Sequence, residues 1–154
     1  MQKRIQRIKM TNIEALALLQ DESITTDMLD ELSTQEDPFV RMRVAGHPKT
    51  SPSTLSLMSK DEIDYVREFV AENQNTPVDT LLKLSSDETV SYWIAGNPNT
   101  PIGILNKFSK DENENIRASV AVNPSTPKET LEILSKDTNE DVRKAVDKNP
   151  INKA

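Results

Sequence analysis

The sequence predicts an all-α protein, a short α-solenoid in which five two-helix units of about 26 residues follow one another along the chain. Two observations lead to this prediction. The same pattern of prolines, leucines, serines and aspartates returns at a nearly constant spacing through most of the 154 residues. In addition, no segment alternates apolar and polar residues with the period of two that marks a half-buried strand.

The repeat is clearest in residues 97–122 and 123–148, which are identical at twelve positions. Residues 47–72 keep the full length, residues 73–96 are two residues shorter, and residues 21–46 are the most divergent copy. The predicted organisation is an N-terminal helical cap at residues 1–20, formed through Ile13, Leu16 and Leu19, then the repeats at residues 21–148, then a C-terminal tail at residues 149–154.

Each unit is expected to begin with a short helix that a threonine caps. Thr76, Thr100 and Thr126 each precede a proline, and a capping hydroxyl followed by proline at the first helical position is a common helix start. Asp79 and Glu129 lie three residues after their threonines, so two units are expected to form capping boxes. The leucines that follow recur as one buried helix face; they are Leu55, Leu81, Leu105 and Leu131.

The second helix of each unit carries the pattern Val/Ile-Arg-x-x-Val/Ile-Ala. Residues four apart share a helix face, so Val66 and Val70 are expected to point into the core together. The adjacent Ala71 would let neighbouring helices approach closely. Glycines (Gly46, Gly96) or Asn-Pro pairs follow this helix, and we expect them to end it because Gly and Asn tolerate a left-handed cap and Pro cannot continue the helix.

The complete unit, N-P-x-T-P-x-x-x-L-x-x-L-S-x-D-x-x-x-x-V-R-x-x-V-A, resembles the leucine-rich repeat variant, a HEAT-like family of α-solenoids. The resemblance covers residues 21–148 and implies a right-handed superhelix whose units pair an α-helix with a shorter, partly 3₁₀ helix. It brings no catalytic residues with it. The sequence departs from the pattern at Ser91, where an arginine is expected, and in the two residues missing just before it.

The composition excludes several kinds of site. The chain has no cysteine, which excludes disulfides, thiolate metal sites and cysteine nucleophiles. Its acidic stretches lack the alternating ligands and central glycine of an EF-hand loop, and His47, the one histidine, has no second ligand in register. We interpret His47 as a helix terminator in the place of an asparagine. No nucleophile–base pair is recognisable, so we expect no enzyme activity, no metal and no cofactor.

The charge and hydropathy patterns bear on location and partners. The net charge is −6, and an acidic chain is poorly suited to neutralise phosphates, so nucleic acid is an unfavourable partner. The one basic segment is the N-terminal arm with Lys3, Arg4, Arg7 and Lys9. No stretch is apolar for long enough to span a bilayer or to act as a secretory signal. We therefore expect a cytoplasmic protein without membrane contact.

A column of arginines is the most regular polar feature of the sequence. A buried guanidinium needs an acceptor, and an aspartate six residues earlier in the same unit is the obvious candidate. We favour a structural ladder that ties one unit to the next over a row of anion-binding sites, because buried charges are normally paired. The ladder residues are Arg41, Arg67, Arg117, Arg143, Asp61, Asp111 and Asp137.

A second column departs from the repeat in an informative way. The residue before the second-helix valine is Phe39, Tyr65, Thr89, Asn115 and Asp141 in the five units, and four residues later come Arg43, Phe69, Trp93, Ser119 and Ala145. The first three units therefore show aromatic residues and an arginine where the last two show small or polar residues, and Tyr92 lies next to Trp93 on the outward side of its helix. Such residues dominate binding hot spots. The simpler alternative is that Phe39, Phe69 and Trp93 fill the edge of the core, with Tyr65 and Tyr92 exposed. The candidate partner-binding residues are Phe39, Arg43, Tyr65, Phe69, Tyr92 and Trp93.

The functional hypothesis is a non-enzymatic protein–protein interaction scaffold that uses the second-helix face of residues 39–93, because solenoids present extended surfaces. The alternative is a nucleic-acid-binding α-solenoid that uses the basic N-terminal arm. Association of copies through an end face of the solenoid stays open at this point. The sequence does not identify the partner.

Overall fold

The computed structural model describes residues 10–153, and this part of the chain contains eleven α-helices and no strands. The fold is the predicted all-α arrangement. Helix α1 (Asn12–Leu18) is followed by alternating first and second helices, and two short 3₁₀ helices, η1 (Glu88–Val90) and η2 (Pro150–Lys153), complete the list. The first helices are α2 (Thr26–Leu32), α4 (Pro52–Met58), α6 (Val78–Leu84), α8 (Ile102–Phe108) and α10 (Lys128–Leu134); the second are α3 (Pro38–Ala45), α5 (Asp64–Glu72), α7 (Ser91–Gly96), α9 (Glu114–Val122) and α11 (Glu140–Asp147).

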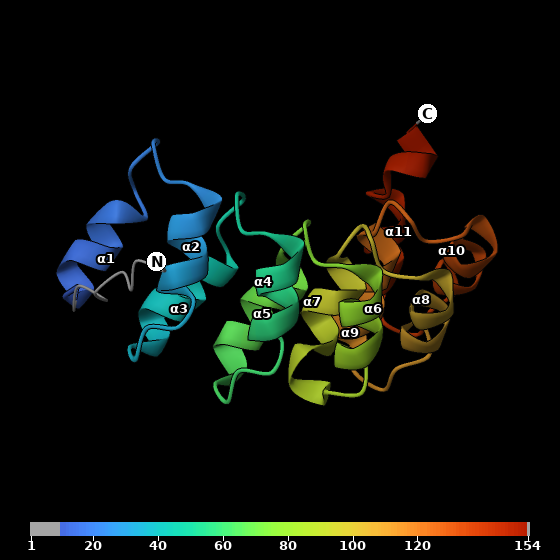
Figure 1. Cartoon of the computed structure of the whole chain (residues 1–154). Helices are drawn as coiled ribbons and strands as arrows, with labels where there is room; N and C mark the ends of the chain where they lie inside the picture. Colours follow the sequence, from blue (N-terminus) through green and yellow to red (C-terminus); the bar gives the residue numbers. More distant parts are fainter. Residues whose placement is uncertain (1–9, 154) are drawn as a thin grey trace.

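The helices form two layers that run along an elongated molecule (Figure 1). The second helices pack side by side in chain order, α3 against α5, α5 against α7, α7 against α9 and α9 against α11. Each first helix packs against the second helix that follows it, and α8 and α10 also pack against the second helix that precedes them. Helix α1 contacts α3 and so extends the second-helix layer at the N-terminal end.

The core lies between these two layers and is almost entirely aliphatic. Each first helix contributes a leucine, and each second helix contributes two β-branched residues at positions i and i+4, as the pattern predicts, except that the first member of the α7 pair, Val90, lies in η1. Val66, Val70 and Ala71 of α5 are fully buried, and Phe108 is the one aromatic side chain of the described residues within the buried core. The leucine column is also buried as predicted: Leu55, Leu81, Leu105 and Leu131.

The predicted threonine caps are wrong. Helices α6, α8 and α10 begin one residue after the proline, and their N-cap residues are Pro77, Pro101 and Pro127, which form no side-chain cap. The predicted capping boxes with Asp79 and Glu129 are therefore absent. Each threonine instead donates its hydroxyl backward to a carbonyl at the end of the preceding second helix: Thr50 to Val44, Thr76 to Val70, Thr100 to Ile94 and Thr126 to Val120, at 2.5, 2.5, 2.5 and 2.6 Å.

The second helices also end differently from the expectation. No residue from 10 to 153 has a positive φ, so the glycines and asparagines do not form left-handed caps. Asn97 and Asn123, which follow α7 and α9, are extended, with φ near −70°. The asparagines end these helices because their side chains form other hydrogen bonds, described below.

The helix pairs differ from the family expectation in one respect. The resemblance implies a partly 3₁₀ helix in each unit, but the first helices and most of the second helices are α-helical throughout. The exception is the predicted third unit, residues 73–96, where the two-residue deletion shortens the loop before the second helix. There the chain forms η1 and then the six-residue α7.

The N-terminal helix packs through two of the three predicted residues, Leu16 and Leu19, but not through Ile13. Ala15 and Leu19 of the α1 region are buried, and Leu16 is half-buried. Ile13, expected to contribute to the cap, is 81% exposed. Thr11 and Glu14 form a capping box at the start of α1, which directs Ile13 away from α3.

Candidate functional site

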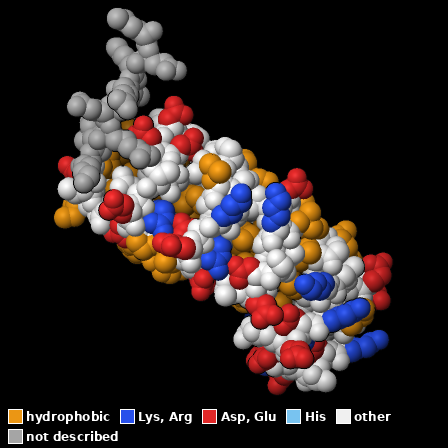
Figure 2. All heavy atoms as spheres, turned by 60° about the horizontal axis from the view of Figure 1, so that its bottom comes forward, with side chains coloured by type: hydrophobic (Ala, Val, Ile, Leu, Met, Phe, Trp, Pro, Cys, Tyr) orange, Lys and Arg blue, Asp and Glu red, His pale blue; other side chains and the backbone are white. Residues whose placement is uncertain are grey.

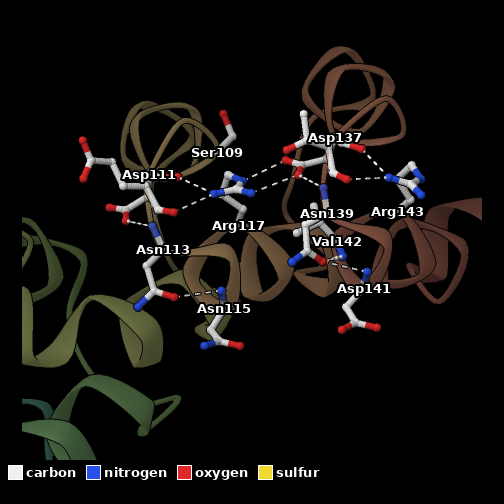
Figure 3. Close-up of polar contacts among 12 residues, drawn as sticks. Ser109, Asp111, Asn113, Asn115, Arg117, Asp137, Asn139, Asp141, Val142 and Arg143 are labelled. Atoms are coloured by element: carbon white, nitrogen blue, oxygen red, sulfur yellow. Dashed lines mark hydrogen bonds and ion pairs between the residues drawn. The ribbon is translucent and has the colours of Figure 1, made fainter.

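The arginine column links the N-terminal ends of neighbouring second helices. Arg117 of α9 donates from Nε and Nη2 to both carboxylate oxygens of Asp137, at 2.8 and 2.9 Å, in the bidentate geometry that favours arginine (Figure 3). Its Nη1 donates to the carbonyls of Asp111 and Glu112 in the loop before its own helix. Arg41 and Asp61 repeat this bidentate contact between α3 and the loop before α5.

The pairing within these contacts differs from the prediction. The residue six positions before each arginine accepts through its backbone carbonyl; it is an aspartate for Arg67, Arg117 and Arg143, as with Asp61 and Arg67 at 2.8 Å, and Gln35 for Arg41. The carboxylate partner lies 20 residues after the arginine, in the next unit, as Asp87 does for Arg67. The reason is geometric, because the carboxylate of each aspartate points toward the preceding helix while its carbonyl faces its own.

The ion pairs shift the pKa values of their members. Hydrogen bonding to Arg117 lowers the pKa of Asp137 and outweighs the burial that would raise it. Burial alone would raise the pKa of Asp61, but hydrogen bonds from Arg41 and from the Ile63 amide lower it below its ordinary value. The pKa of Arg117 is raised by the same bond to Asp137. These groups are therefore ionised and engaged with each other at neutral pH.

The column has a gap between α7 and α9. Ser91 stands at the arginine position, is buried, and donates only to the Asp87 carbonyl at 3.3 Å. The Asp111 carboxylate accepts the Asn113 amide and, within residues 10–153, receives no arginine (Figure 3). Arg143, the last arginine of the column, is held by the carbonyls of Asp137 and Thr138.

A second set of contacts, which the sequence analysis missed, links the C-terminal ends of the same helices. Asn123 donates from Nδ2 to the carbonyls of Ala95 and Asn97, at 2.7 and 2.8 Å, and its Oδ1 accepts the Ser125 amide. Asn73, Asn97 and Asn149 make the same three bonds in their own registers. We call these four buried side chains the asparagine ladder.

The sequence did carry a signal for this ladder. The asparagines recur at one register, three residues after the buried valine or isoleucine of the second helix. A residue that only ended the helix in solvent would not need to be an asparagine at each of these four positions. A buried primary amide needs several partners, and only a neighbouring unit can offer them at that position. The signal was read as local helix termination, so its partners were not predicted.

His47 occupies the ladder position at the end of α3 and makes only part of the same contacts. Its Nδ1 accepts the Lys49 amide at 3.1 Å, as an asparagine Oδ1 would. The Lys49 ammonium supplies the cross-unit bonds instead, to the carbonyls of Glu22 and Ile24. Burial, Lys49 and Arg43 lower the pKa of His47, so the imidazole is neutral at pH 7. His47 thus ends α3, as interpreted from the sequence.

The candidate partner-binding residues all lie on the second-helix layer, on α3, α5 and α7. Phe39, Tyr65 and Tyr92 are 48%, 39% and 46% exposed, which confirms the expected exposure of the two tyrosines. Phe69 and Trp93 are half-buried and pack against the core. The core-edge interpretation therefore holds for Phe69 and Trp93 but is wrong for Phe39.

Three of these aromatic rings make close contacts. The Tyr92 and Trp93 rings meet edge to face with centroids 5.1 Å apart. The Phe69 ring lies over Gly46 of the preceding helix, where an added Cβ would come within 2.7 Å of its Cδ1 atom. Gly46 is thus needed for the approach of Phe69, although its φ is ordinary.

A recess opens beside Phe69, between the ends of α3 and α5. It consists of two adjoining hollows of about 480 and 180 Å³ that share Gly46, Pro48 and Phe69. Arg43 and His47 line the smaller hollow, and Glu72 with Gln74 lines the larger one, while Arg43 makes no ion pair within the described residues. We call this the Phe69 recess.

The exposed charges are mixed in sign on the face drawn in Figure 2, where lysines and arginines lie scattered among apolar and acidic side chains. The basic N-terminal arm with Lys3, Arg4, Arg7 and Lys9 lies outside the described residues. In residues 10–153 no three His, Cys, Asp or Glu side chains are grouped as metal ligands would be. No helix in that range combines the length and the apolar character needed to cross a membrane.

Comparisons with known proteins agree with the fold. No protein-family model and no curated protein matches the sequence. Among solved structures, a leucine-rich repeat variant described as having a novel repetitive structural motif aligns with a TM-score of 0.62 and 27% identity over 86% of this chain. The alignment covers 53% of that protein, so this chain spans about half its length. The predicted resemblance is confirmed, and the chain is similar in fold to a leucine-rich repeat variant.

Proposed function

We propose that the chain is a non-enzymatic protein–protein interaction scaffold whose binding surface is the exposed side of α3, α5 and α7, within residues 39–93. The coarser statement, a helical repeat scaffold, follows from the fold. The location of the binding surface rests on one observation. Phe39, Tyr65 and Tyr92 expose aromatic surface on consecutive helices, whereas the residues in register with Tyr65 on α9 and α11 are Asn115 and Asp141.

Physical reasoning supports this surface over the rest of the molecule. Positions that hold the solenoid together must repeat, as the leucines and the asparagine ladder do, but a surface matched to a partner has no such requirement. Tyrosine and arginine contribute strongly when a partner removes them from water, and Arg43 lies on the same side of α3 without an ion pair among the described residues. The two half-buried rings, Phe69 and Trp93, would support the exposed ones.

The test uses photo-crosslinking in cells that produce the protein. Tyr65→p-benzoylphenylalanine and Tyr92→p-benzoylphenylalanine should both form adducts with the same partner protein. Ile102→p-benzoylphenylalanine is the matched control, because Ile102 is at least as exposed as the two tyrosines but lies on α8 in the other layer. Adduct formation at all three positions alike, or at none of them, would refute the proposed surface.

A second measurement separates binding from folding. In a chain that carries Phe39→p-benzoylphenylalanine, the further changes Tyr65→Ala and Tyr92→Ala should abolish adduct formation with the partner. The Tm of this variant should stay within about 2 °C of the parent, because exposed side chains contribute little to stability. Undiminished adducts in this variant would show that the tyrosines are not part of the interface.

A further inference from the structure

The Phe69 recess has a defined structural origin. Gly46 leaves the end of α3 without a side chain, and Pro48 turns the chain away directly afterwards. The Phe69 ring enters from α5 and forms an apolar wall, held at the distance that Gly46 allows. In the same register the other units carry Glu72, Gly96, Val122 and Lys148. Gly96 is the other glycine of this register, and there the neighbour is the Ser119 hydroxyl, 3.1 Å from the place of an added Cβ, and no aromatic ring.

The rim of the recess is held in place by hydrogen bonds. The Asn75 side chain donates to the carbonyls of Pro48 and Thr50, at 2.7 and 3.2 Å. The Asn73 amide is fully used in the asparagine ladder directly beneath. Because these groups are already paired, the recess exists before any ligand arrives, which lowers the entropic cost of binding.

The recess carries opposite charges at its two ends. Arg43 lines the smaller hollow and Glu72 the larger one, and both side chains are exposed and outside the ion pairs of the described residues. The Phe69 ring lies on the wall common to both hollows. His47 adds no charge to the Arg43 end at pH 7, because its pKa is lowered. A ligand that complements this surface has a carboxylate, an apolar group and a cation in that order.

We infer that the Phe69 recess binds a linear segment of the partner protein, in which an apolar side chain packs on Phe69 between an acidic residue at Arg43 and a basic residue at Glu72. This inference rests on the proposed function and adds the chemistry of the partner to it. A peptide supplies all three groups on one chain, and the volume suits one large side chain with its neighbours. A polyanion would meet Glu72, and an anionic membrane would meet both Glu72 and the net charge of −6.

The experiment selects ligands from a displayed library of random dodecapeptides on the full chain. Recovered peptides should share an apolar residue with an acidic residue on one side and a basic residue on the other. Fluorescence anisotropy with these peptides should show at least a tenfold loss of affinity in Arg43→Glu and in Glu72→Lys. Lys83→Glu on α6 and Glu132→Lys on α10 make the same charge changes on exposed side chains of the other layer and should leave the affinity unchanged.

A charge exchange distinguishes a direct contact from a general electrostatic effect. A peptide whose acidic residue is replaced by lysine should bind Arg43→Glu at least tenfold better than it binds the parent chain. Gly46→Ala displaces the Phe69 ring and should therefore weaken the binding of peptides with a large apolar residue. Gly103→Ala, at an open position, should leave their affinity unchanged.

Each other outcome overturns a distinct part of the argument. Recovery of peptides that respond to Tyr65→Ala and Tyr92→Ala but not to changes at Arg43 or Glu72 would refute the recess and leave the proposed function in place. Failure to recover any peptide would refute a linear segment as the ligand, and the crosslinking experiment would still decide the proposed function. Peptides indifferent to all of these changes, together with absent crosslinks, would refute both.

Discussion

The contact between α9 and α11 and the contact between α7 and α9 agree at one end of the helices and differ at the other. At the C-terminal ends, Asn149 and Asn123 make equivalent bonds to the preceding helix. At the N-terminal ends, Arg117 binds Asp137 between α9 and α11, whereas Ser91 leaves Asp111 without an arginine between α7 and α9.

The difference shows which of the two links the fold requires. The asparagines pair the buried alanine carbonyls at or near the ends of the preceding helices, which helix termination would otherwise leave unpaired, so losing these bonds is costly. The second acceptor of each asparagine also accepts a threonine amide. The arginine pairs first require a charged side chain to lose much of its water, so forming the pair stabilises the fold only a little. Removing one partner costs more than this net gain, because the other charge is left partly buried without a partner. The unit in which Ser91 replaces the arginine also has the shortened loop and η1, and no buried polar side-chain atom of the described residues is left without a partner.

The largest effect is expected from removing the arginine of the α9–α11 contact, because the loop before α9 keeps its full length. Arg117→Leu should lower the free energy of unfolding by about 3 kcal/mol, because it leaves the mostly buried Asp137 carboxylate and two loop carbonyls without their donor. Urea unfolding measures the change. A loss below about 1 kcal/mol would mean that the loop relaxes as it has around Ser91.

The next effect concerns the link that both contacts share. Asn123→Ala should cost about 2 kcal/mol, because the Ala95 and Asn97 carbonyls lose buried donors. Asn115→Ala on the exposed side of α9 is the control and should change stability by less than about 0.5 kcal/mol. Hydrogen exchange at the end of α7 should accelerate in Asn123→Ala alone, and equal exchange in both variants would contradict the role of the ladder.

A pH series sharpens the comparison further. The folded-state pKa of Asp137 lies below its ordinary 3.8, chiefly through the bond from Arg117, so the unfolded chain binds more protons in acid. The stability that this pair contributes is complete above about pH 5 and is lost as the pH falls through the folded-state pKa. The free-energy gap between the parent chain and Arg117→Leu should therefore narrow below about pH 4. A gap that stays constant down to pH 3 would show that the ion pair does not account for it.

The smallest effect is expected from an ion pair on the surface of the same helix. Lys144 and Glu140 of α11 lie 2.8 Å apart with both side chains largely exposed. Lys144→Ala should change stability by about 0.5 kcal/mol or less, because solvent and salt screen such pairs. The ratio of this change to that of Arg117→Leu measures how much burial strengthens the arginine link. A loss as large as that of Arg117→Leu would contradict the distinction.

The sequence predicted the helices and the core well because both follow from residues within one unit. The leucines on the first helices and the valine pairs on the second are buried as their spacing requires. Contacts between units were predicted less well. The aspartate of each arginine pair lies 20 residues away instead of six, and Thr76, Thr100 and Thr126 bond backward instead of capping forward. These partners depend on how the units stack, which the spacing within one unit does not specify.

The candidate surface was predictable in part. The tyrosines were expected to be exposed because aromatic hydroxyl groups favour contact with water, and Tyr65 and Tyr92 are exposed. The exposure of Phe39 was not foreseen, since an apolar residue at a helical spacing is usually buried. The Phe69 recess arises from the absence of a side chain at Gly46 next to a ring from another unit, so no single unit indicates it.

The asparagine ladder has a consequence for how this array changes length. The two residues deleted from the third unit fall between Asp87 and Val90, and Asn97 still reaches its carbonyls, now 26 and 24 residues back instead of the 28 and 26 that separate Asn123 from its own. Asn73, Asn97, Asn123 and Asn149 thus donate to equivalent acceptors at four successive junctions, while His47 with Lys49 takes their place at the first. Whole units can therefore be duplicated or removed without new contacts being needed between the units that become neighbours. Small changes in length are tolerated in loops that do not contribute to the asparagine ladder, as in the loop between Asp87 and Val90.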